Sequence, residues 1–205
     1  MRQTLLDFHQ NLNEQEKGSI TEKLLKKVSE LSEYKNAEII FAYIPDRLEA
    51  DCMPVIQDAL KNGKKVCVPK VDFESSKSGK NEMDFYFLDS SRPIEDQLET
   101  GTYGIREPKA GLEIFRGVAG YSSGTACGDR LFKNTFIFVL VPGVAFTKDG
   151  KRLGHGKGFY DIYIERFKQE GIKPFLCGFC LPCQIVDEIP TDEHDVLMDE
   201  VVTVN

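Results

Sequence analysis

Phe136 to Val141, Phe-Ile-Phe-Val-Leu-Val, is the stretch that decides the fold. A run that is apolar at every position is typical of a central strand in a parallel sheet, because such a strand is covered on both faces. Pro142 and Gly143 follow and should end the strand. Residues 158–171 then place apolar side chains on one helical face. The segment therefore predicts a buried strand, a loop and a helix.

The same order of elements is predicted upstream. Residues 37–43 (AEIIFAY) are short, apolar and rich in β-forming residues, which indicates a buried strand. Residues 51–61 predict a helix closed by Gly63, and residues 65–68 (KVCV) predict a strand stopped by Pro69. A strand, a helix and a second strand in this order favour a parallel sheet with crossover helices.

The remaining elements complete an α/β pattern. Asn13 with Glu16 three residues later resembles a helix N-cap and its acidic partner. The helix that follows should turn four apolar residues toward the core: Ile20, Leu24, Val28 and Leu31. Further strands are expected at 84–88, 174–179 and 201–204, and the turn-rich stretch 109–130 predicts a surface loop. We expect one Rossmann-like domain over residues 1–205, with a mainly parallel sheet and helices on both faces in three layers.

Composition narrows the classes of function. The chain has 205 residues, a net charge of −7 and a pI of about 5.1, which argues against a dedicated nucleic-acid binder. Its start has no apolar signal-peptide region, and its longest apolar run, 136–146, is too short to span a bilayer. We expect a cytoplasmic monomer that acts on small molecules, without a nucleic-acid or membrane partner. The six cysteines should be free thiols, since Cys180-Leu-Pro-Cys183 lacks the second pair that a zinc site needs.

Arg152 to Asp161, Arg-Leu-Gly-His-Gly-Lys-Gly-Phe-Tyr-Asp, carries the clearest chemistry. Glycines at 154, 156 and 158 let backbone N–H groups approach an anion, and the following helix N-terminus favours the same anion. Arg152 and Lys157 add two cations, and Asp161 could hold a magnesium ion that bridges phosphates. The pattern predicts a phosphate site.

Two familiar phosphate motifs do not fit this loop. The Walker A loop needs four residues between its glycines and Ser or Thr after the Lys, and the dinucleotide fingerprint has a different glycine spacing. From the residues alone, a plain glycine-rich turn, with Asp161 merely complementing a helix dipole, remains open.

Val141-Pro-Gly-Val-Ala-Phe146, Gly150 and the stretch Arg152 to Asp161 together resemble the signature of the 5-formyltetrahydrofolate cyclo-ligase family. Leu48-Glu49 is similar to the family's acidic folate-contact segment, and Gly104 to Pro108 to its Gly-Ile-x-Glu-Pro turn. The C-terminal pattern is also similar, at Gln184, Ile189-Pro190, His194-Asp195 and Asp199.

The resemblance implies transfer of the ATP γ-phosphoryl group to the formyl oxygen of 5-formyltetrahydrofolate, and then attack by N10 to give the methenyl product. It implies ATP as co-substrate and Mg²⁺ as cofactor. Catalysis would involve Arg152, Lys157 and Tyr160. ATP would be bound by Arg2, Arg152, Leu153, Gly154, His155, Gly156, Lys157, Gly158, Phe159 and Tyr160. The folate substrate would contact Glu49, Tyr103, His155 and Tyr160, and the metal would be held by Asp161 and Asp195.

Some of these roles depend on the resemblance alone. Without it, Glu49 would be read as a solvated surface acid and Tyr103 as a packed loop residue. Arg2 falls on the Arg of the family's N-terminal Lys-x-x-x-Arg pair, whose Lys would precede residue 1. The rival hypothesis is a relative that has lost catalysis and binds nucleotide, folate or RNA.

Overall fold

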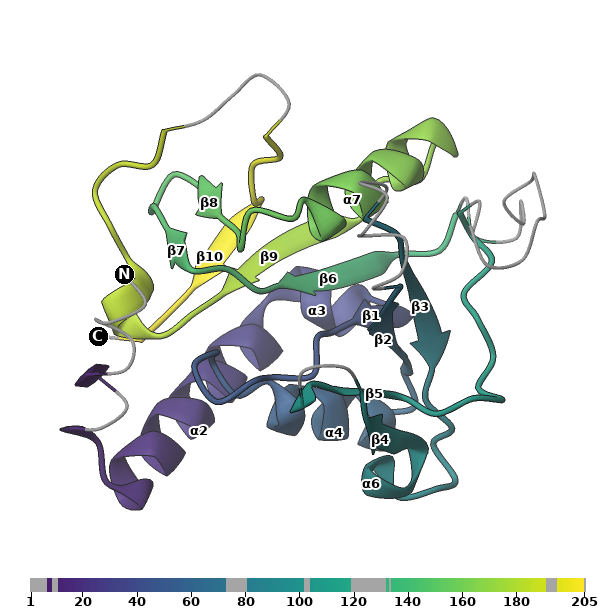
Figure 1. Ribbon diagram of the computed structural model, residues 1–205, viewed down its shortest axis with the longest axis horizontal. Coiled ribbons are helices and arrows are strands. Elements are labelled where there is room, and N and C mark those ends of the chain that lie inside the picture. The colour runs from purple at the N-terminus through teal and green to yellow at the C-terminus, as the bar shows by residue number, and fades with distance from the viewer. Residues whose placement is uncertain are drawn as a thin grey trace.

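A six-stranded sheet forms the centre of the computed structural model, which describes residues 7–8, 11–72, 81–101, 104–118, 132, 134–190 and 195–204 (Figure 1). The strand order is β10-β9-β6-β1-β2-β3, and only β3 runs antiparallel to its neighbour. The strands are β1 (Ile39–Phe41), β2 (Lys65–Val71), β3 (Met83–Phe87), β6 (Ile137–Val141), β9 (Phe175–Phe179) and β10 (Glu200–Val202). Two small antiparallel pairs join β4 (Leu98–Thr100) to β5 (Arg106–Pro108) and β7 (Ala145–Phe146) to β8 (Arg152–Leu153).

Helices cover both faces of the sheet. One face carries α2 (Glu14–Glu30), α3 (Ser32–Asn36) and α4 (Met53–Lys61), and the other carries α7 (Phe159–Gln169) (Figure 1). Two short helices, α6 (Ile94–Gln97) and the 3₁₀ turn η3 (Pro182–Gln184), complete the described elements. The predicted three-layer α/β fold is therefore confirmed.

β6 occupies the interior position that its sequence predicts. All five of its residues are buried, and it pairs in parallel with β1 on one side and β9 on the other. Its side chains alternate between two cores. Phe138 packs in the α2–α4 core with Leu24, Val28 and Val55, whereas Ile137, Val139 and Val141 join the α7 core. In the α7 core, the ring centroids of Phe41 and Phe167 lie 5.4 Å apart.

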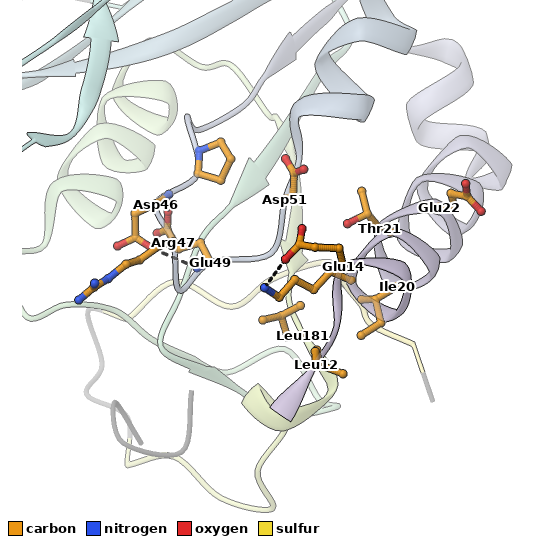
Figure 2. A pocket seen from close by; sticks show the side chains of 13 residues that line it. Leu12, Glu14, Ile20, Thr21, Glu22, Asp46, Arg47, Glu49, Asp51 and Leu181 are labelled. Atoms are coloured by element: carbon orange, nitrogen blue, oxygen red, sulfur yellow. Dashed lines mark hydrogen bonds and ion pairs between the residues drawn. The ribbon is translucent and has the colours of Figure 1, made fainter. Parts of the chain in front are cut away.

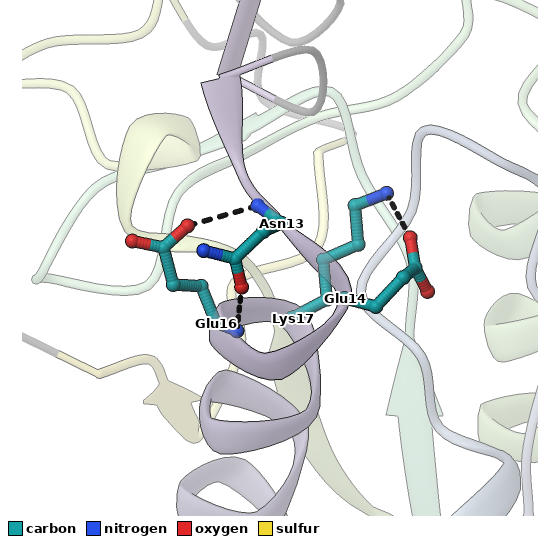
Figure 3. Close-up of polar contacts among 4 residues, drawn as sticks. All are labelled: Asn13, Glu14, Glu16 and Lys17. Carbon is teal, nitrogen blue, oxygen red and sulfur yellow. Dashed lines mark hydrogen bonds and ion pairs between the residues drawn. The ribbon is translucent and has the colours of Figure 1, made fainter.

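The start of α2 follows the predicted capping box (Figure 3). The Asn13 side-chain oxygen accepts a hydrogen bond from the Glu16 backbone N–H at 2.9 Å, and the Glu16 carboxylate accepts one from the Asn13 N–H at 2.8 Å. Each contact satisfies a backbone donor that a helix N-terminus leaves unpaired. Glu14 and Lys17 form an ion pair on the adjacent surface. Leu31 is the C-cap, so the predicted apolar face extends one residue beyond the helix.

The prediction that Pro69 stops β2 is wrong, because the strand continues to Val71. The Val66 carbonyl accepts a hydrogen bond from Leu88 on the β3 side, and the Cys67 carbonyl accepts one from Ala42 on the β1 side. Backbone groups alternate along a strand, so the Pro69 nitrogen faces the β1 side. β1 has already ended there, and the missing N–H breaks no ladder bond.

The β7–β8 pair sits on the sheet through a tight aromatic contact. A Cβ atom placed on Gly143 or on Gly178 would lie 2.7 Å from ring atoms of Phe146, which is closer than atoms can approach. Phe146 is fully buried, so the ring fits between two backbone positions that have no side chain. This contact fixes the start of the glycine-rich loop against β9.

Candidate active site

The strand order creates a crevice at the carboxyl ends of β1 and β6. From β1 the chain passes through α4 to β2 on one side, and from β6 it passes through α7 to β9 on the other. Neighbouring strands whose connections diverge in this way mark the position where open α/β sheets bind ligands. A cleft of about 620 Å³ lies there, lined by Tyr43 and Ile44 after β1 and by Pro142 after β6.

The glycine-rich loop forms one wall of this cleft. Every residue from Arg152 to Asp161 lines it. Gly156 and Gly158 have φ values of +77° and +67°, which side chains disfavour, so glycine is required for this path. Gly158 is the N-cap of α7 and gives its first turn no side-chain hydrogen bond. Among the described residues, no side-chain cap hydrogen bond occupies the first N–H groups of α7, which suits anion binding, and the exposed Lys157 precedes them in the loop.

Arg152 and Asp161 contact each other across the loop. Nη2 of Arg152 donates to both carboxylate oxygens of Asp161, at 2.7 and 2.8 Å, and Nη1 donates to the Pro142 carbonyl at 3.3 Å. The Arg152 side chain is only 7% exposed, whereas that of Asp161 is 32% exposed. A Cβ atom on Gly154 would lie 2.8 Å from Nη1, so this glycine also makes room for the guanidinium. The predicted phosphate cation and the predicted metal ligand are therefore paired with each other.

Glu49 and Tyr160 line the same cleft and interact electrostatically. Glu49 is half-buried and accepts a hydrogen bond from the Asp46 N–H at 3.0 Å. Desolvation raises its pKa to about 7, and the Asp46 hydrogen bond offsets this only in part. Burial, followed by the nearby Glu49 charge, raises the pKa of Tyr160 well above its usual value. The Tyr160 hydroxyl is buried without a hydrogen-bond partner among the described residues. Glu49 is thus not the solvated surface acid that the residue alone suggests.

The two predicted metal ligands line the same cleft. Within the described ranges, no three His, Cys, Asp or Glu side chains gather closely enough to hold a metal ion. Mg²⁺ commonly takes one or two carboxylates and completes its coordination with phosphate oxygens and water. Asp161 and Asp195 therefore fit a metal that takes its remaining ligands from phosphate oxygens and water.

The third wall was not predicted from the sequence. Ile105, Arg106 and Glu107 line the cleft from β5 and the turn before it. Pro69 and Val71 of β2 and Met83 of β3 add apolar surface. The Gly-Ile-x-Glu-Pro turn resembles the family's turn, but a turn motif alone predicts no role in a cleft. Arg2 and Tyr103, predicted to contact nucleotide and folate, lie outside the described residues, as does His194.

A second cavity of about 640 Å³ lies between the first half of α2 and the loop after β1 (Figure 2). Its lining includes Glu14, Lys17 and Thr21 of α2, and it shares Asp46 and Glu49 with the main cleft. The loop that carries Glu49 therefore separates the two cavities.

No cysteine is among the described residues that line the cleft. The five cysteines of the described residues are free thiols: Cys52, Cys67, Cys177, Cys180 and Cys183. For these five the predicted free-thiol state is confirmed. In the part of the chain that the structure describes, no helix combines the length and apolarity needed to cross a membrane.

The fold and the cleft, taken together with relatives named as ligases, define an α/β enzyme of the ligase class with a glycine-rich loop at the point where the strand connections diverge. The chain belongs to the 5-formyltetrahydrofolate cyclo-ligase family, which it matches over residues 1–119 and 125–204. The family predicted from the loop signature is thereby confirmed.

Named relatives and solved structures agree with this assignment. The chain is 32% identical to the mouse 5-formyltetrahydrofolate cyclo-ligase over 180 residues, which cover 87% of this chain and 79% of the mouse protein. It is 32% identical to the Saccharomyces cerevisiae cyclo-ligase over 167 residues, which cover 77% and 71% of the two chains. The Aquifex aeolicus 5,10-methenyltetrahydrofolate synthetase structure superposes with a TM-score of 0.70 at 29% identity, covering 98% of this chain and 87% of that one. These matches support cyclo-ligase activity.

Proposed function

We propose that this protein cyclises 5-formyltetrahydrofolate to 5,10-methenyltetrahydrofolate in a reaction that consumes ATP and depends on Mg²⁺. One observation carries the proposal: the anion-binding loop before α7 and the desolvated carboxyl group of Glu49 line one cleft at the switch point of the sheet. The loop suits a triphosphate, and the carboxyl group suits a ligand rich in N–H donors. Both substrates of the reaction would then meet in the same space.

The phosphate side of the cleft would be formed by the loop and the start of α7. The unpaired N–H groups of the first helical turn and the Lys157 ammonium group would neutralise the phosphate oxygens. The Nε of Arg152 is buried without a hydrogen-bond partner among the described residues, so it offers one further donor. Phosphoryl transfer needs this kind of positioning and charge neutralisation more than covalent help from the protein.

The folate side would be formed around Glu49. A carboxylate accepts two parallel hydrogen bonds from the adjacent ring N–H and amino groups of a pterin, and such charge-assisted pairs are strong in a desolvated site. A pKa near 7 leaves Glu49 partly protonated at neutral pH before the substrate binds. Two approaching donors would favour the ionised form. The unpaired Tyr160 hydroxyl, close to both the loop and Glu49, would face the formyl group.

The chemistry follows from a leaving-group problem. The formyl oxygen of an amide leaves poorly, whereas its phosphorylated form leaves as phosphate. The γ-phosphoryl group passes to the formyl oxygen with release of ADP. N10 then attacks the formyl carbon, N10 loses a proton, and the C–O bond breaks to give the methenyl bridge and inorganic phosphate. The chain would hold N10 and the activated carbon within reach of each other and exclude water.

Mg²⁺, when bound with the nucleotide, would supply charge neutralisation on the phosphate oxygens. Asp161 and Asp195 would hold it, and Asp161 would exchange its contact with Arg152 for this role. Arg152, once released, would be free to turn toward the phosphates. We also propose that residues 1–205 act as a monomer on small molecules alone, which light scattering of the purified protein tests.

The decisive test incubates purified protein with ATP, MgCl₂ and 5-formyltetrahydrofolate and follows the absorbance of the methenyl product alongside ADP release. One ADP per methenyl product supports the proposal. Binding of nucleotide or folate without product would favour the rival hypothesis, a relative that has lost catalysis. ATP hydrolysis without cyclisation would reject the proposed reaction.

A further inference from the structure

The β4–β5 pair stands apart from the main sheet but contributes to the cleft. Within the residues that the structure describes, its two strands pair only with each other, in the register Leu98↔Pro108, Glu99↔Glu107 and Thr100↔Arg106. Its turn end carries Ile105, which is 46% exposed and lines the cleft together with Arg106 and Glu107. An isolated two-stranded hairpin is only marginally stable in water, so its position over the cleft depends on other contacts.

Two acidic residues oppose each other within this hairpin. Glu99 and Glu107 are direct cross-strand partners, and like charges in that arrangement destabilise the pair. Lys70 of β2 lies between them: its Nζ is 3.0 Å from Glu107 Oε1 and 3.5 Å from Glu99 Oε1. The same Nζ donates to the Pro108 carbonyl at 3.0 Å. One ammonium group thus contacts both carboxylates, offsets the repulsion between them and joins the hairpin to β2.

The geometry of Gly101 supports this arrangement. A Cβ atom at residue 101 would lie 2.4 Å from the Glu107 side chain, so only glycine lets the Glu107 carboxylate lie along the hairpin. Partial desolvation lowers the pKa of Lys70, but its hydrogen bonds and charge contacts with Glu107 and Glu99 outweigh this, and the pKa rises overall. The ammonium form of Lys70 is therefore the form that the cluster stabilises.

Lys70 does not itself line the cleft. Pro69 and Val71, its neighbours along β2, both do, and alternation along the strand turns Lys70 to the opposite face of the sheet. The side chain of Lys70 therefore reaches the cleft through the hairpin that it holds. The hairpin presents an exposed apolar side chain, and this wall is completed by the apolar residues Val71 and Met83. Such a wall suits the ring system of a folate better than a triphosphate.

We infer that Lys70 is a positioning residue for the folate substrate: through Glu99, Glu107 and the Pro108 carbonyl it sets the hairpin wall against which the folate binds. This inference rests on the proposed function for the identity of the ligand. The nucleotide, bound at the glycine-rich loop, should be largely unaffected by Lys70. Arginine at position 70 should preserve the cluster, because a guanidinium group can also contact two carboxylates and a carbonyl oxygen.

The first test needs no catalysis. Hydrogen exchange of residues 98–108 is compared in the wild type, Lys70→Met, Lys70→Arg and Lys70→Met with Glu99→Gln. Exchange should rise about 10-fold in Lys70→Met, remain near wild type in Lys70→Arg, and fall back partly in the double variant, which lacks the opposed charges. Unchanged exchange in Lys70→Met would overturn the inference, and this result would be independent of whether the protein is a cyclo-ligase.

The second test separates the substrates. Lys70→Met should raise the KM for 5-formyltetrahydrofolate about 10-fold while the KM for ATP stays within about twofold, and Lys70→Arg should restore both. A general loss of folded protein would lower kcat without separating the two KM values. If both KM values move together, or neither moves while hairpin exchange rises, the folate role is overturned.

Should Lys70→Met fail to fold, Glu99→Gln with Lys70→Gln provides the same comparison without the opposed charges. A wild type without turnover would count against the proposed function, and folate-induced protection of residues 98–108 would then decide this inference.

Discussion

Replacing Arg152 by methionine tests the contact at the centre of the cleft. The substitution keeps an unbranched side chain but removes both hydrogen bonds to Asp161 and the one to Pro142. Breaking a fully buried ion pair costs about 3–5 kcal/mol. Because Asp161 is 32% exposed, water recovers part of its solvation. We therefore expect the free energy of unfolding to fall by about 2–3 kcal/mol.

Urea unfolding followed by circular dichroism measures this change. Lys168→Met is the matched control, since it removes the pair of Lys168 with Glu165, in which both side chains are more than half exposed, on the same helix as Asp161. The control should cost less than about 1 kcal/mol. Combining Arg152→Met with Asp161→Asn in a double-mutant cycle isolates the pair itself. A coupling energy close to zero, or a loss no larger than in the control, would refute the reasoning.

The same variant has a consequence for metal binding. If Arg152 occupies the carboxylate that a metal needs, Arg152→Met should bind Mn²⁺, a probe for Mg²⁺, more tightly without nucleotide. We expect an increase in affinity of about 10-fold, which corresponds to about 1.4 kcal/mol. Arg152→Lys distinguishes competition for the Asp161 carboxylate from charge repulsion between residue 152 and the metal. Lysine keeps the charge but cannot reach Asp161 and Pro142 together, so competition predicts tighter binding, whereas repulsion alone predicts no change. Wild-type affinity in both variants would show that Asp161 is not a shared group.

Three further predictions concern residues on the other sides of the cleft. Glu49→Gln should raise the KM for folate by roughly 10- to 150-fold, the worth of one charge-assisted pair, with little effect on the KM for ATP; equal effects on both would exclude a pterin role. Since the pKa of Glu49 is raised from 4.5 to about 7, the wild type should lose stability as the pH rises from about 4.5 to 7, and Glu49→Gln should flatten this slope in pH-dependent urea unfolding. Asp161→Asn and Asp195→Asn should each raise the Mg²⁺ concentration needed for half-maximal turnover, and wild-type rates at limiting Mg²⁺ would rule them out as ligands.

The N-terminal prediction still awaits a test. Arg2→Ala should raise the KM for ATP, and an N-terminal extension that places a Lys four residues before Arg2 should lower it. A charged hydrogen bond of about 1.5–3 kcal/mol sets the scale of both effects. If neither variant alters the KM for ATP, Arg2 has no role at the nucleotide, while the role proposed for the glycine-rich loop is unaffected.

Local signals in the sequence were sufficient for most of the fold. The unbroken apolar run of β6 predicted its central position, and the Asn13–Glu16 pair predicted the start of α2, because each signal depends on neighbouring residues. The prediction that the strand ends at Pro69 was wrong because the effect of a proline depends on which neighbouring strand its nitrogen faces. That is a property of the sheet and not of the local sequence. Pairing between distant segments is invisible to local patterns.

The candidate site also combines features that local sequence signals predict with contacts that they do not. The loop from Arg152 to Asp161 could be recognised because its glycines, cations and carboxylate are contiguous. The contact between Arg152 and Asp161 could not be predicted, since the same two residues suit a phosphate and a metal equally well. Lys70 gave no signal at all: its partners lie 29 to 38 positions later in the chain and meet it only through the hairpin.

The fit of the Phe146 ring between Gly143 and Gly178 also constrains how this protein can change over evolutionary time. A methyl group at either glycine would collide with the ring, so alanine should be rejected at both positions as long as phenylalanine remains. A smaller residue at 146 would leave a void, yet it would make alanine acceptable at the glycines. Substitutions at positions 143, 146 and 178 should therefore occur in a fixed order during evolution, with the aromatic residue at 146 changing first. In an alignment of relatives, larger residues at 143 or 178 should accompany a reduced side chain at 146.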